Sequence, residues 1–320
     1  MPLIESTYRA PWGCANGHVQ SIVPALWRRV PAVPMERVRI ATPDDDFIDL
    51  DCVREGSGRV AIISHGLEGN SRQPYVQGMA RALVKRGWDV IAWNCRGCSG
   101  EMNRRLRFYH SGASEDLAVV VDHALANSSW RRVALVGFSL GGNMTLKYLG
   151  ERGAAVDPRI HAAATFSVPC DLAASSVRLG HWSNRLYMER FMRTLRGKVL
   201  AKAVNYPAEL DTTHLAAMRT FKNFDDRYTA PLHGFTSAED YWHRSGSVKF
   251  LAAIRVRSLL VNAHDDPFLA GECFPGNIAD ASEHFHLETP RHGGHVGFIT
   301  RGASGEYWSE TRAAEFLETA

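Results

Sequence analysis

The residues with the clearest chemical potential are Gly-Phe-Ser-Leu-Gly at positions 137–141. A short apolar run at 133–136 precedes them, and a run that is compatible with a helix follows at 143–149. In a nucleophile elbow, a serine occupies a sharp turn between a strand and a helix, and flanking glycines prevent a collision where the two elements approach. Such a turn exposes the hydroxyl and places free helix N–H groups beside it. The sequence therefore predicts that Ser139 is a nucleophile, with a chance Gly-Ser turn as the alternative.

A serine hydroxyl is a poor nucleophile at neutral pH unless a base takes its proton. The sequence contains 14 histidines, and the base should follow a strand, where its loop can reach the edge of the sheet that carries Ser139. His295 meets this condition, because it follows the last expected strand and two glycines lead directly into it. His292 lies in the same loop and is the alternative base.

The base needs a carboxylate that holds its tautomer and stabilises its protonated form. Asp266 is the first candidate, because it follows the penultimate expected strand and precedes bulky residues. Asp265 would then hydrogen-bond or cap the turn, although it could also be the acid. Asp171, after the strand that ends near residue 167, is a third candidate. The chain order serine, aspartate, histidine is that of α/β-hydrolases and differs from the orders of the chymotrypsin and subtilisin types.

A tetrahedral oxyanion requires two hydrogen-bond donors. One is expected from the backbone N–H of Leu140, the residue after the candidate nucleophile. The other is expected from the loop after residues 59–64, where His65-Gly66-Leu67 fits an H-G-x pattern and the N–H of Leu67 is the chosen donor. His65 is expected to orient this loop and not to act as a base.

The elements that must position these residues alternate between strands and helices from about residue 59 onwards. This alternation predicts a mostly parallel sheet with helices on both faces. Before it, residues 36–41 and 47–53 alternate polar and apolar positions around a turn, which predicts an antiparallel hairpin. Ser114 is expected to be the N-cap of a helix at 114–126. The other expected strands lie at 59–64, 88–93, 133–136, 160–167, 256–262 and 285–289, and the other helices begin near residue 16 or lie at 75–86, 143–149 and 309–318.

The strand–helix pattern is interrupted at residues 173–248, which contain no convincing strand. We expect a single α/β-hydrolase domain over residues 1–320, with 173–248 as a helical cap over the substrate pocket. Apolar residues at helical spacing from 188 to 199, with a basic side that includes Lys202, predict a packed helix with a solvated face; docking on a membrane is the alternative. The aromatic and charged residues at 224–228 and 241–242 are expected to pin the cap to the sheet by a salt bridge, or else to line an acyl pocket.

The composition is that of an ordinary globular protein, with 45% hydrophobic and 22% charged residues. A net charge of +3 is too small to indicate nucleic-acid binding. We expect no signal peptide and no membrane-spanning helix, because neither pattern is present. The six scattered cysteines are typical of a reducing compartment, so we expect a cytoplasmic protein. The C-x-x-C at 95–98 has no second half that would complete a metal site, so we expect two thiols in a loop.

Several longer motifs resemble the YheT-like α/β-hydrolases, a family that also includes eukaryotic medium-chain ethyl-ester synthases/esterases and a phospholipase branch. Besides the elbow, these motifs are H-G-L-E-G-N-S from residue 65, N-C-R-G-C-S-G from 94, Y-H-S-G from 109, F-D-D-R-Y-T-A-P-L from 224, H-D-D-P-F from 264 and H-G-G-H-V-G-F from 292. The resemblance runs from about residue 16 to 298. It implies the α/β-hydrolase fold, with Ser139 as nucleophile, Asp266 as acid, His295 as base, and no metal or organic cofactor.

The expected activity is hydrolysis of carboxylic esters through an acyl-enzyme, on short-to-medium acyl chains, because the aromatic residues of the cap fill space. The alternatives are an alcohol acyltransferase (ester synthase) and a lipase or phospholipase, all using the same triad. A non-catalytic lipid-binding protein of this fold is less expected, because no triad position is replaced. The expected partner is a small ester or lipid, with at most peripheral membrane contact; the sequence assigns no oligomeric state.

Overall fold

The computed structural model describes residues 2–302 and 305–319, and nine strands within them form one sheet. The strand order is β1-β9-β8-β7-β6-β4-β5-β3-β2. β3 pairs antiparallel with both β2 and β5, and the other neighbouring strands are parallel. The strands are β1 (Leu3–Ile4), β2 (Glu36–Ala41), β3 (Phe47–Val53), β4 (Arg59–Ser64), β5 (Asp89–Asn94), β6 (Arg132–Phe138), β7 (Ile160–Phe166), β8 (Arg257–Val261) and β9 (Phe285–Glu288).

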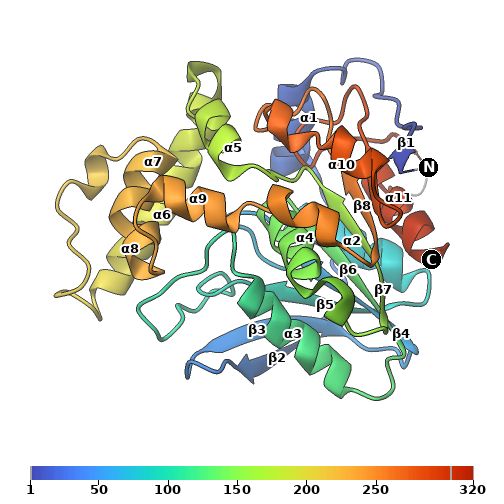
Figure 1. Cartoon of the computed structure of the whole chain (residues 1–320), viewed down its shortest axis with the longest axis horizontal. Helices are drawn as coiled ribbons and strands as arrows, with labels where there is room; N and C mark the ends of the chain where they lie inside the picture. The colour runs from blue at the N-terminus through green and yellow to red at the C-terminus, as the bar shows by residue number, and fades with distance from the viewer. Residues whose placement is uncertain (1, 303–304, 320) are drawn as a thin grey trace.

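Helices pack on both faces of this sheet (Figure 1). α2 and α11 share one face, and α3 and α4 share the other. Successive side chains of a strand point to opposite faces, so in β4 Ala61 and Ile63 join the core under α2, whereas Val60 and Ile62 join the core under α4. Burial on both faces explains why the central strands are continuous apolar runs. The helices are α1 (Gly17–Trp27), α2 (Pro74–Val84), α3 (Ser114–Ala126), α4 (Leu140–Arg152), α5 (Leu172–Leu179), α6 (Arg185–Ala203), α7 (Phe221–Phe224), α8 (Ala230–Leu232), α9 (Ala238–Ser245), α10 (Gly276–Asp280) and α11 (Trp308–Glu318).

The mostly parallel sheet and the antiparallel hairpin β2–β3 confirm the fold predicted from the sequence. The prediction for Ser114 is wrong, because the N-cap position of α3 is Ala113. The Ser114 hydroxyl instead donates to Glu151 and accepts from Lys147, both on the neighbouring helix α4. β1 was not predicted, since two residues are too few to show a periodic pattern.

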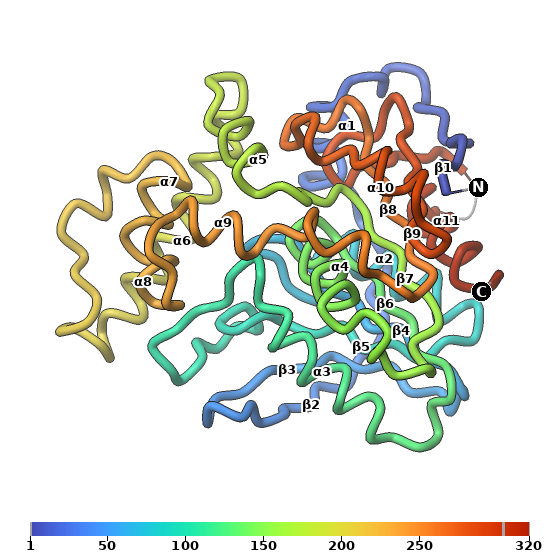
Figure 2. Tube along the Cα trace, viewed as in Figure 1, coloured from blue at the N-terminus to red at the C-terminus, as the bar shows by residue number. Residues whose placement is uncertain are grey.

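Between β7 and β8 the chain leaves the sheet and forms α5–α9, with a π-helical segment at Asp225–Thr229 between α7 and α8. We call residues 172–245 the insertion. Its helices α6, α7 and α8 lie at one end of the molecule, and β1 and α11 lie at the other (Figure 2). Phe108 follows β5 and Phe268 follows β8, and both belong to the apolar cluster of the insertion. The insertion is therefore packed onto loops at the carboxyl ends of core strands.

The longest helix of the insertion, α6, has its apolar side buried within that cluster, as Met188, Met192 and Val199 show. The prediction that Lys202 lies on a solvated basic side is wrong, because this residue is fully buried. Its ammonium group donates to the carbonyl oxygen of Asn103 at 2.7 Å, and burial lowers the pKa of Lys202 to about 8. The prediction of a packed helix therefore holds for the apolar side of α6. Among the described helices, none combines the length and the apolar character that crossing a bilayer requires.

A buried ion-pair network ties the hairpin to the sheet. Arg96 follows β5, is 3% exposed, and contacts three carboxylates: Asp44 at 2.9 Å, Asp46 at 3.0 Å and Asp116 at 2.8 Å. Asp44 and Asp46 come from the β2–β3 turn, and Asp116 from the first turn of α3. Removing Arg96 takes away the cation that these three carboxylates share, and two of them, Asp46 and Asp116, are buried.

Replacing Arg96 with methionine should therefore lower the free energy of unfolding by about 3–5 kcal/mol, as measured by urea denaturation. The control is Arg227→Met, which breaks an exposed pair with Asp211. This control should cost no more than about 1 kcal/mol. Equal losses in the two variants would show that the buried network does not hold the hairpin in place.

Candidate active site

Ser139 lies at the turn between β6 and α4, in the middle of the sheet. Its φ of +51° and ψ of −119° are values that residues with a side chain rarely adopt. The close approach of strand and helix requires glycine at two positions. A Cβ atom at Gly137 would lie 2.5 Å from the Cα of Gly142, and one at Gly141 would lie 2.5 Å from the carbonyl oxygen of His65. The turn has the conformation of a nucleophile elbow.

The ring of His295 lies between Ser139 and Asp266. Its Nε2 atom is 2.9 Å from the Ser139 Oγ, and its Nδ1 atom is 2.9 Å and 3.2 Å from the two carboxylate oxygens of Asp266. A neutral ring in this position donates from Nδ1 to the carboxylate and accepts the serine proton at Nε2. Asp266 is 3% exposed, and its Oδ1 also accepts from the N–H of Phe268 at 2.9 Å. The structure thus brings the three predicted residues within hydrogen-bonding distance.

The alternative candidates form a pair of their own, away from the Ser139 hydroxyl. The Nδ1 atom of His292 is 3.1 Å from a carboxylate oxygen of Asp265. The other oxygen of Asp265 accepts from the N–H of Gly294 at 2.8 Å, so this acid fixes the loop that carries His295. Asp171 caps α5, accepting from the N–H of Ala174. Among the described hydrogen bonds, no side chain of His292, Asp265 or Asp171 bonds to Ser139, His295 or Asp266.

Three residues that the sequence analysis did not assign hold His295 in place. The Oγ of Ser21, on α1, accepts from the backbone N–H of His295 at 2.8 Å, and the Oγ of Ser167 accepts from the N–H of Val296 at 2.8 Å. The Phe268 ring packs on the His295 ring with centroids 4.1 Å apart. Phe268 belongs to a recognised motif, which could have drawn attention to it. Ser21 lies 274 residues away in the chain, so no local pattern signals its contact.

Strained backbone is concentrated around this site. Seven non-glycine residues of the described chain have a positive φ, and five of them lie in loops at the carboxyl ends of β4, β6, β7 and β9. These are Glu68, Ser139, Ser167, Val296 and Phe298. Each such residue costs on the order of 1–3 kcal/mol, and strain of this kind persists where the surroundings force it, often at functional sites. The residues with positive φ therefore lie at the same edge of the sheet as the hydrogen-bonded Ser139, His295 and Asp266.

The loop after β4 is held against Ser139 by two tyrosines. The hydroxyl of Tyr75 accepts from the N–H of Gly66 at 2.9 Å, and that of Tyr109 accepts from the N–H of Glu68 at 2.8 Å. A Cβ atom at Gly66 would lie 3.2 Å from the Cβ of Ser139, so the loop approaches the nucleophile closely. The N–H of Leu67, between these two anchored amides, donates to no acceptor among the described hydrogen bonds. It is therefore free to donate to a ligand.

His65 shapes this loop from within. It is fully buried, its Nε2 accepts from the N–H of Cys95 at 3.0 Å, and its Nδ1 is 2.7 Å from the carbonyl oxygen of Gly66. Because Nε2 accepts, Nδ1 carries the proton and donates to Gly66. Burial lowers the pKa of His65 to about 4, which keeps the ring neutral. This neutral tautomer suits a positioning residue.

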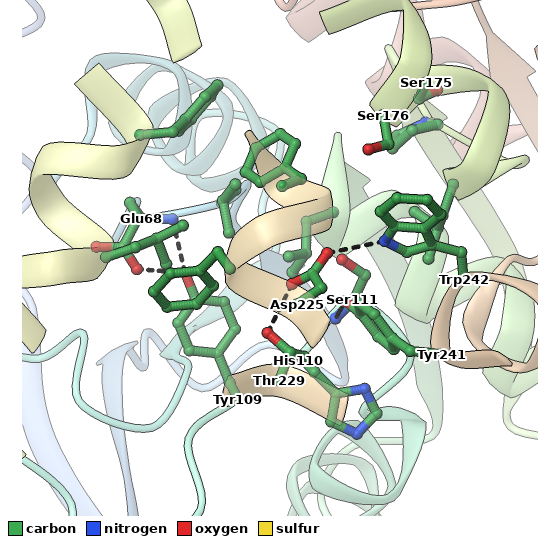
Figure 3. A pocket seen from close by; sticks show the side chains of 18 of the residues that line it. Glu68, Tyr109, His110, Ser111, Ser175, Ser176, Asp225, Thr229, Tyr241 and Trp242 are labelled. Carbon is green, nitrogen blue, oxygen red and sulfur yellow. Dashed lines mark hydrogen bonds between the residues drawn. The ribbon is translucent and has the colours of Figure 1, made fainter. Parts of the chain in front are cut away.

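Two cavities meet at Ser139, and Leu67, Phe268 and His295 line both. The insertion cavity has a volume of about 120 Å³ and is lined in part by residues of α5, α6, α7 and α9. Figure 3 shows side chains of its lining. The α1 cavity has a volume of about 370 Å³ and runs along the end of α1 and the start of α6. A substrate whose reacting carbon lies at Ser139 can therefore extend in two directions.

The predicted motifs at 224–228 and 241–242 form no salt bridge to the sheet among the described ion pairs, and their aromatic residues line the cavity together with Asp225. Arg227 pairs with Asp211, and Asp226 pairs with Lys222, so both ion pairs stay inside the insertion. The predicted salt bridge is therefore wrong, and the alternative of a pocket lining agrees with the structure. The lining includes Phe224, Asp225, Tyr228, Tyr241 and Trp242.

Metal-binding chemistry finds no support in the described part of the chain. No group of three or more histidine, cysteine, aspartate or glutamate side chains there could hold a metal ion. All six cysteines are buried free thiols. Burial raises the pKa of Cys95 and Cys98, so the C-x-x-C has the inert character of structural cysteines.

Comparison with known proteins identifies the family. Residues 61–301 match the family model described as the alpha/beta hydrolase fold, which is about three quarters of the chain. This chain belongs to the α/β-hydrolase family. Its relatives include proteins named as esterases, which supports a carboxylic ester hydrolase activity for this α/β hydrolase.

Three relatives of this α/β hydrolase show the range of the group. It is 33% identical to "Putative esterase YheT" of Escherichia coli over 96% of this chain and 92% of the relative. It is 27% identical to human "Phospholipase ABHD3" over 93% of this chain and 75% of that protein. It is 27% identical to the Saccharomyces cerevisiae "Medium-chain fatty acid ethyl ester synthase/esterase 2", over 84% of this chain and 64% of that protein.

Solved structures agree on the fold of this α/β hydrolase. The Pyrococcus furiosus esterase Pf2001 superposes with a TM-score of 0.60 at 17% identity, covering 97% of this chain and 99% of that chain. At this level of identity the likeness concerns the arrangement of the elements.

Proposed function

We propose that this α/β hydrolase is a serine esterase in which Ser139 is the nucleophile, His295 the general base and Asp266 the residue that orients the base. The observation that carries the proposal is the position of the His295 ring, which reaches the Ser139 hydroxyl with one nitrogen and the Asp266 carboxylate with the other. Activation of a serine requires both contacts, because the base must take a proton and its charged form must be stabilised.

In the proposed reaction, Ser139 attacks the ester carbonyl while His295 takes its proton. The backbone N–H groups of Leu67 and Leu140 would then hold the oxyanion, since Leu140 begins α4 and has no partner within the helix. His295 protonates the leaving alcohol, which breaks the ester bond and leaves an acyl group on Ser139. Water, activated by the same histidine, releases the acid and restores the serine.

We further propose that the insertion cavity takes the acyl group. Aromatic and aliphatic side chains, many of them from the insertion, dominate its lining. Its volume of about 120 Å³ is close to that of an engineered apolar cavity of about 150 Å³ in another protein that binds benzene, so about six carbons fit. The size supports a preference for short-to-medium acyl chains.

For p-nitrophenyl esters, kcat/KM should rise with each added acyl carbon by roughly fourfold, because a buried methylene contributes about 0.8 kcal/mol. The rise should end near six to eight carbons, where the cavity is full. A profile from two to sixteen carbons measures this. A flat profile would show that the acyl group lies in solvent, and a maximum at long chains would favour a lipase or phospholipase.

Acyl transfer to an alcohol is the second candidate function, because the α1 cavity opens onto Ser139 beside the acyl site and could hold an acceptor alcohol. The same assay distinguishes it when the products are quantified in the presence of ethanol. Free acid as the main product supports the esterase, and ethyl ester as the main product supports the acyltransferase.

A further inference from the structure

The wall of the insertion cavity contains a buried carboxyl group, that of Asp225. The residue is 7% exposed and lies among the lining side chains, with Thr229 and Trp242 as its hydrogen-bond partners (Figure 3). The hydroxyl of Thr229 donates to one oxygen at 2.6 Å, and the indole N–H of Trp242 donates to the other at 2.8 Å. A carboxylate offers about four acceptor positions, so these two bonds leave about half of its capacity unused.

No cation balances this carboxyl group in the part of the chain that the structure describes. No lysine, arginine or histidine nitrogen there lies within 4.0 Å of Asp225, and the adjacent Asp226 carries a like charge. Glu68, the other carboxylate of the cavity, contrasts with it: the Lys198 ammonium lies 2.9 Å away, and the Tyr109 hydroxyl donates to it at 2.7 Å. Burial, together with the like charge of Asp226, raises the pKa of Asp225 to about 7.

The two internal hydrogen bonds do not require an acid at this position. An asparagine could accept from Trp242 through its oxygen and donate to Thr229 through its amide group. What a carboxyl adds is further acceptor capacity in the wall of the cavity, and an unbalanced buried carboxyl is unfavourable for folding alone. Such a group is expected where a ligand supplies the missing partner.

We propose that Asp225 forms a polar subsite in the acyl cavity that binds a hydroxyl group carried by the acyl chain of the substrate. The inference rests on the proposed esterase function and names its substrate class as hydroxyacyl esters. A hydroxyl group can donate to the ionised carboxylate and can accept from the protonated acid, so it satisfies Asp225 in either state. An alkyl chain of the same length would leave Asp225 with only its two internal hydrogen bonds, from Thr229 and Trp242.

Methyl esters of straight alkanoic acids and of their ω-hydroxy counterparts, from four to ten carbons, provide the test. Hydrolysis is followed by proton release at pH 7.5, and the readout is the ratio of kcat/KM for the hydroxy ester to that for the alkyl ester of equal length. The native enzyme should favour the hydroxy ester at the chain length that reaches Asp225. In Asp225→Leu, that ratio should fall by about tenfold or more, because the hydroxyl loses its partner and the alkyl chain gains an apolar wall.

Asp226→Asn is the matched control, since its side chain pairs with Lys222 outside the cavity, and its ratio should equal the native one. If the leucine variant fails to fold, Asp225→Asn carries the test, because it can keep both internal bonds; its ratio should fall in the same direction. Equal ratios in the native enzyme and in the Asp225 variants, with alkyl esters still hydrolysed, would overturn the subsite alone. If the native enzyme hydrolysed none of the esters, the proposed function itself would be overturned.

Discussion

Replacing Ser139 with alanine should lower kcat for ester hydrolysis by roughly 10³-fold or more, because members of a catalytic triad act as a unit. The structure gives the reason: the His295 Nε2 atom is 2.9 Å from the Ser139 Oγ, and alanine leaves this base without a proton to take. The fold should be unaffected, since alanine keeps the Cβ atom and removes only the hydroxyl. Circular dichroism and the unfolding midpoint check that the variant is intact.

A fluorophosphonate probe, which reacts with activated serines, separates loss of the nucleophile from loss of binding. The native enzyme should be labelled, and Ser139→Ala should not. Ser129→Ala is the control, because Ser129 is an exposed loop residue after α3, and this variant should be labelled like the native enzyme. Labelling of the Ser139→Ala variant at native rates would place the nucleophile at another serine.

Replacing Asp266 with asparagine should lower kcat by about 10²- to 10⁴-fold, whereas Asp265→Asn should cost less than about tenfold. Asp266 accepts from the His295 Nδ1–H, and an amide at this position can donate to Nδ1 and stabilise the wrong tautomer. Asp265 contacts His292 and the N–H of Gly294, and asparagine keeps an acceptor for that N–H. Both substitutions replace a carboxylate oxygen with an amide group, at adjacent positions. Each variant therefore serves as the control for the other.

The test compares kcat of the two variants on one short-chain ester, and thermal unfolding verifies that both are folded. A larger loss in Asp265→Asn than in Asp266→Asn would move the acid role to Asp265. Near-native kcat in both variants would point to Asp171, the remaining candidate from the sequence.

The sequence determined the architecture because the information for it is local. The apolar run of β6, the glycines at 137 and 141, and the helix after them specify a strand, a turn and a helix whose geometry follows from sterics alone. The alternation of such units predicts the parallel sheet, and parallel strands bring their carboxyl ends, and therefore Ser139, Asp266 and His295, to one edge. The hairpin β2–β3 was predictable for the same reason, since its period of two is visible within each strand.

The local errors arose where a tertiary contact overrides a local preference. Serine is a residue type that often caps helices, but the Ser114 hydroxyl hydrogen-bonds to Glu151 and Lys147 of the adjacent helix. Lys202 reads as part of a basic face, but the carbonyl oxygens of Asn103 and Arg105, nearly one hundred residues earlier, draw its ammonium group into the interior. The spacing of residues in the sequence does not reveal either set of contacts.

Only the tertiary structure shows which of two neighbouring candidates contacts His295 and which residues form the walls of the cavity. Asp265 and Asp266 are adjacent in the chain, and their different partners depend on the directions in which one short loop aims two consecutive side chains. Asp225 follows the same rule: its motif suggested a salt bridge, and the folded insertion places it in the wall of the insertion cavity, with Thr229 and Trp242 as its partners. A sequence specifies which chemical groups are present and which elements carry them. The direction of each group is set by packing between segments that are distant in the chain, because that packing selects the rotamers and loop conformations.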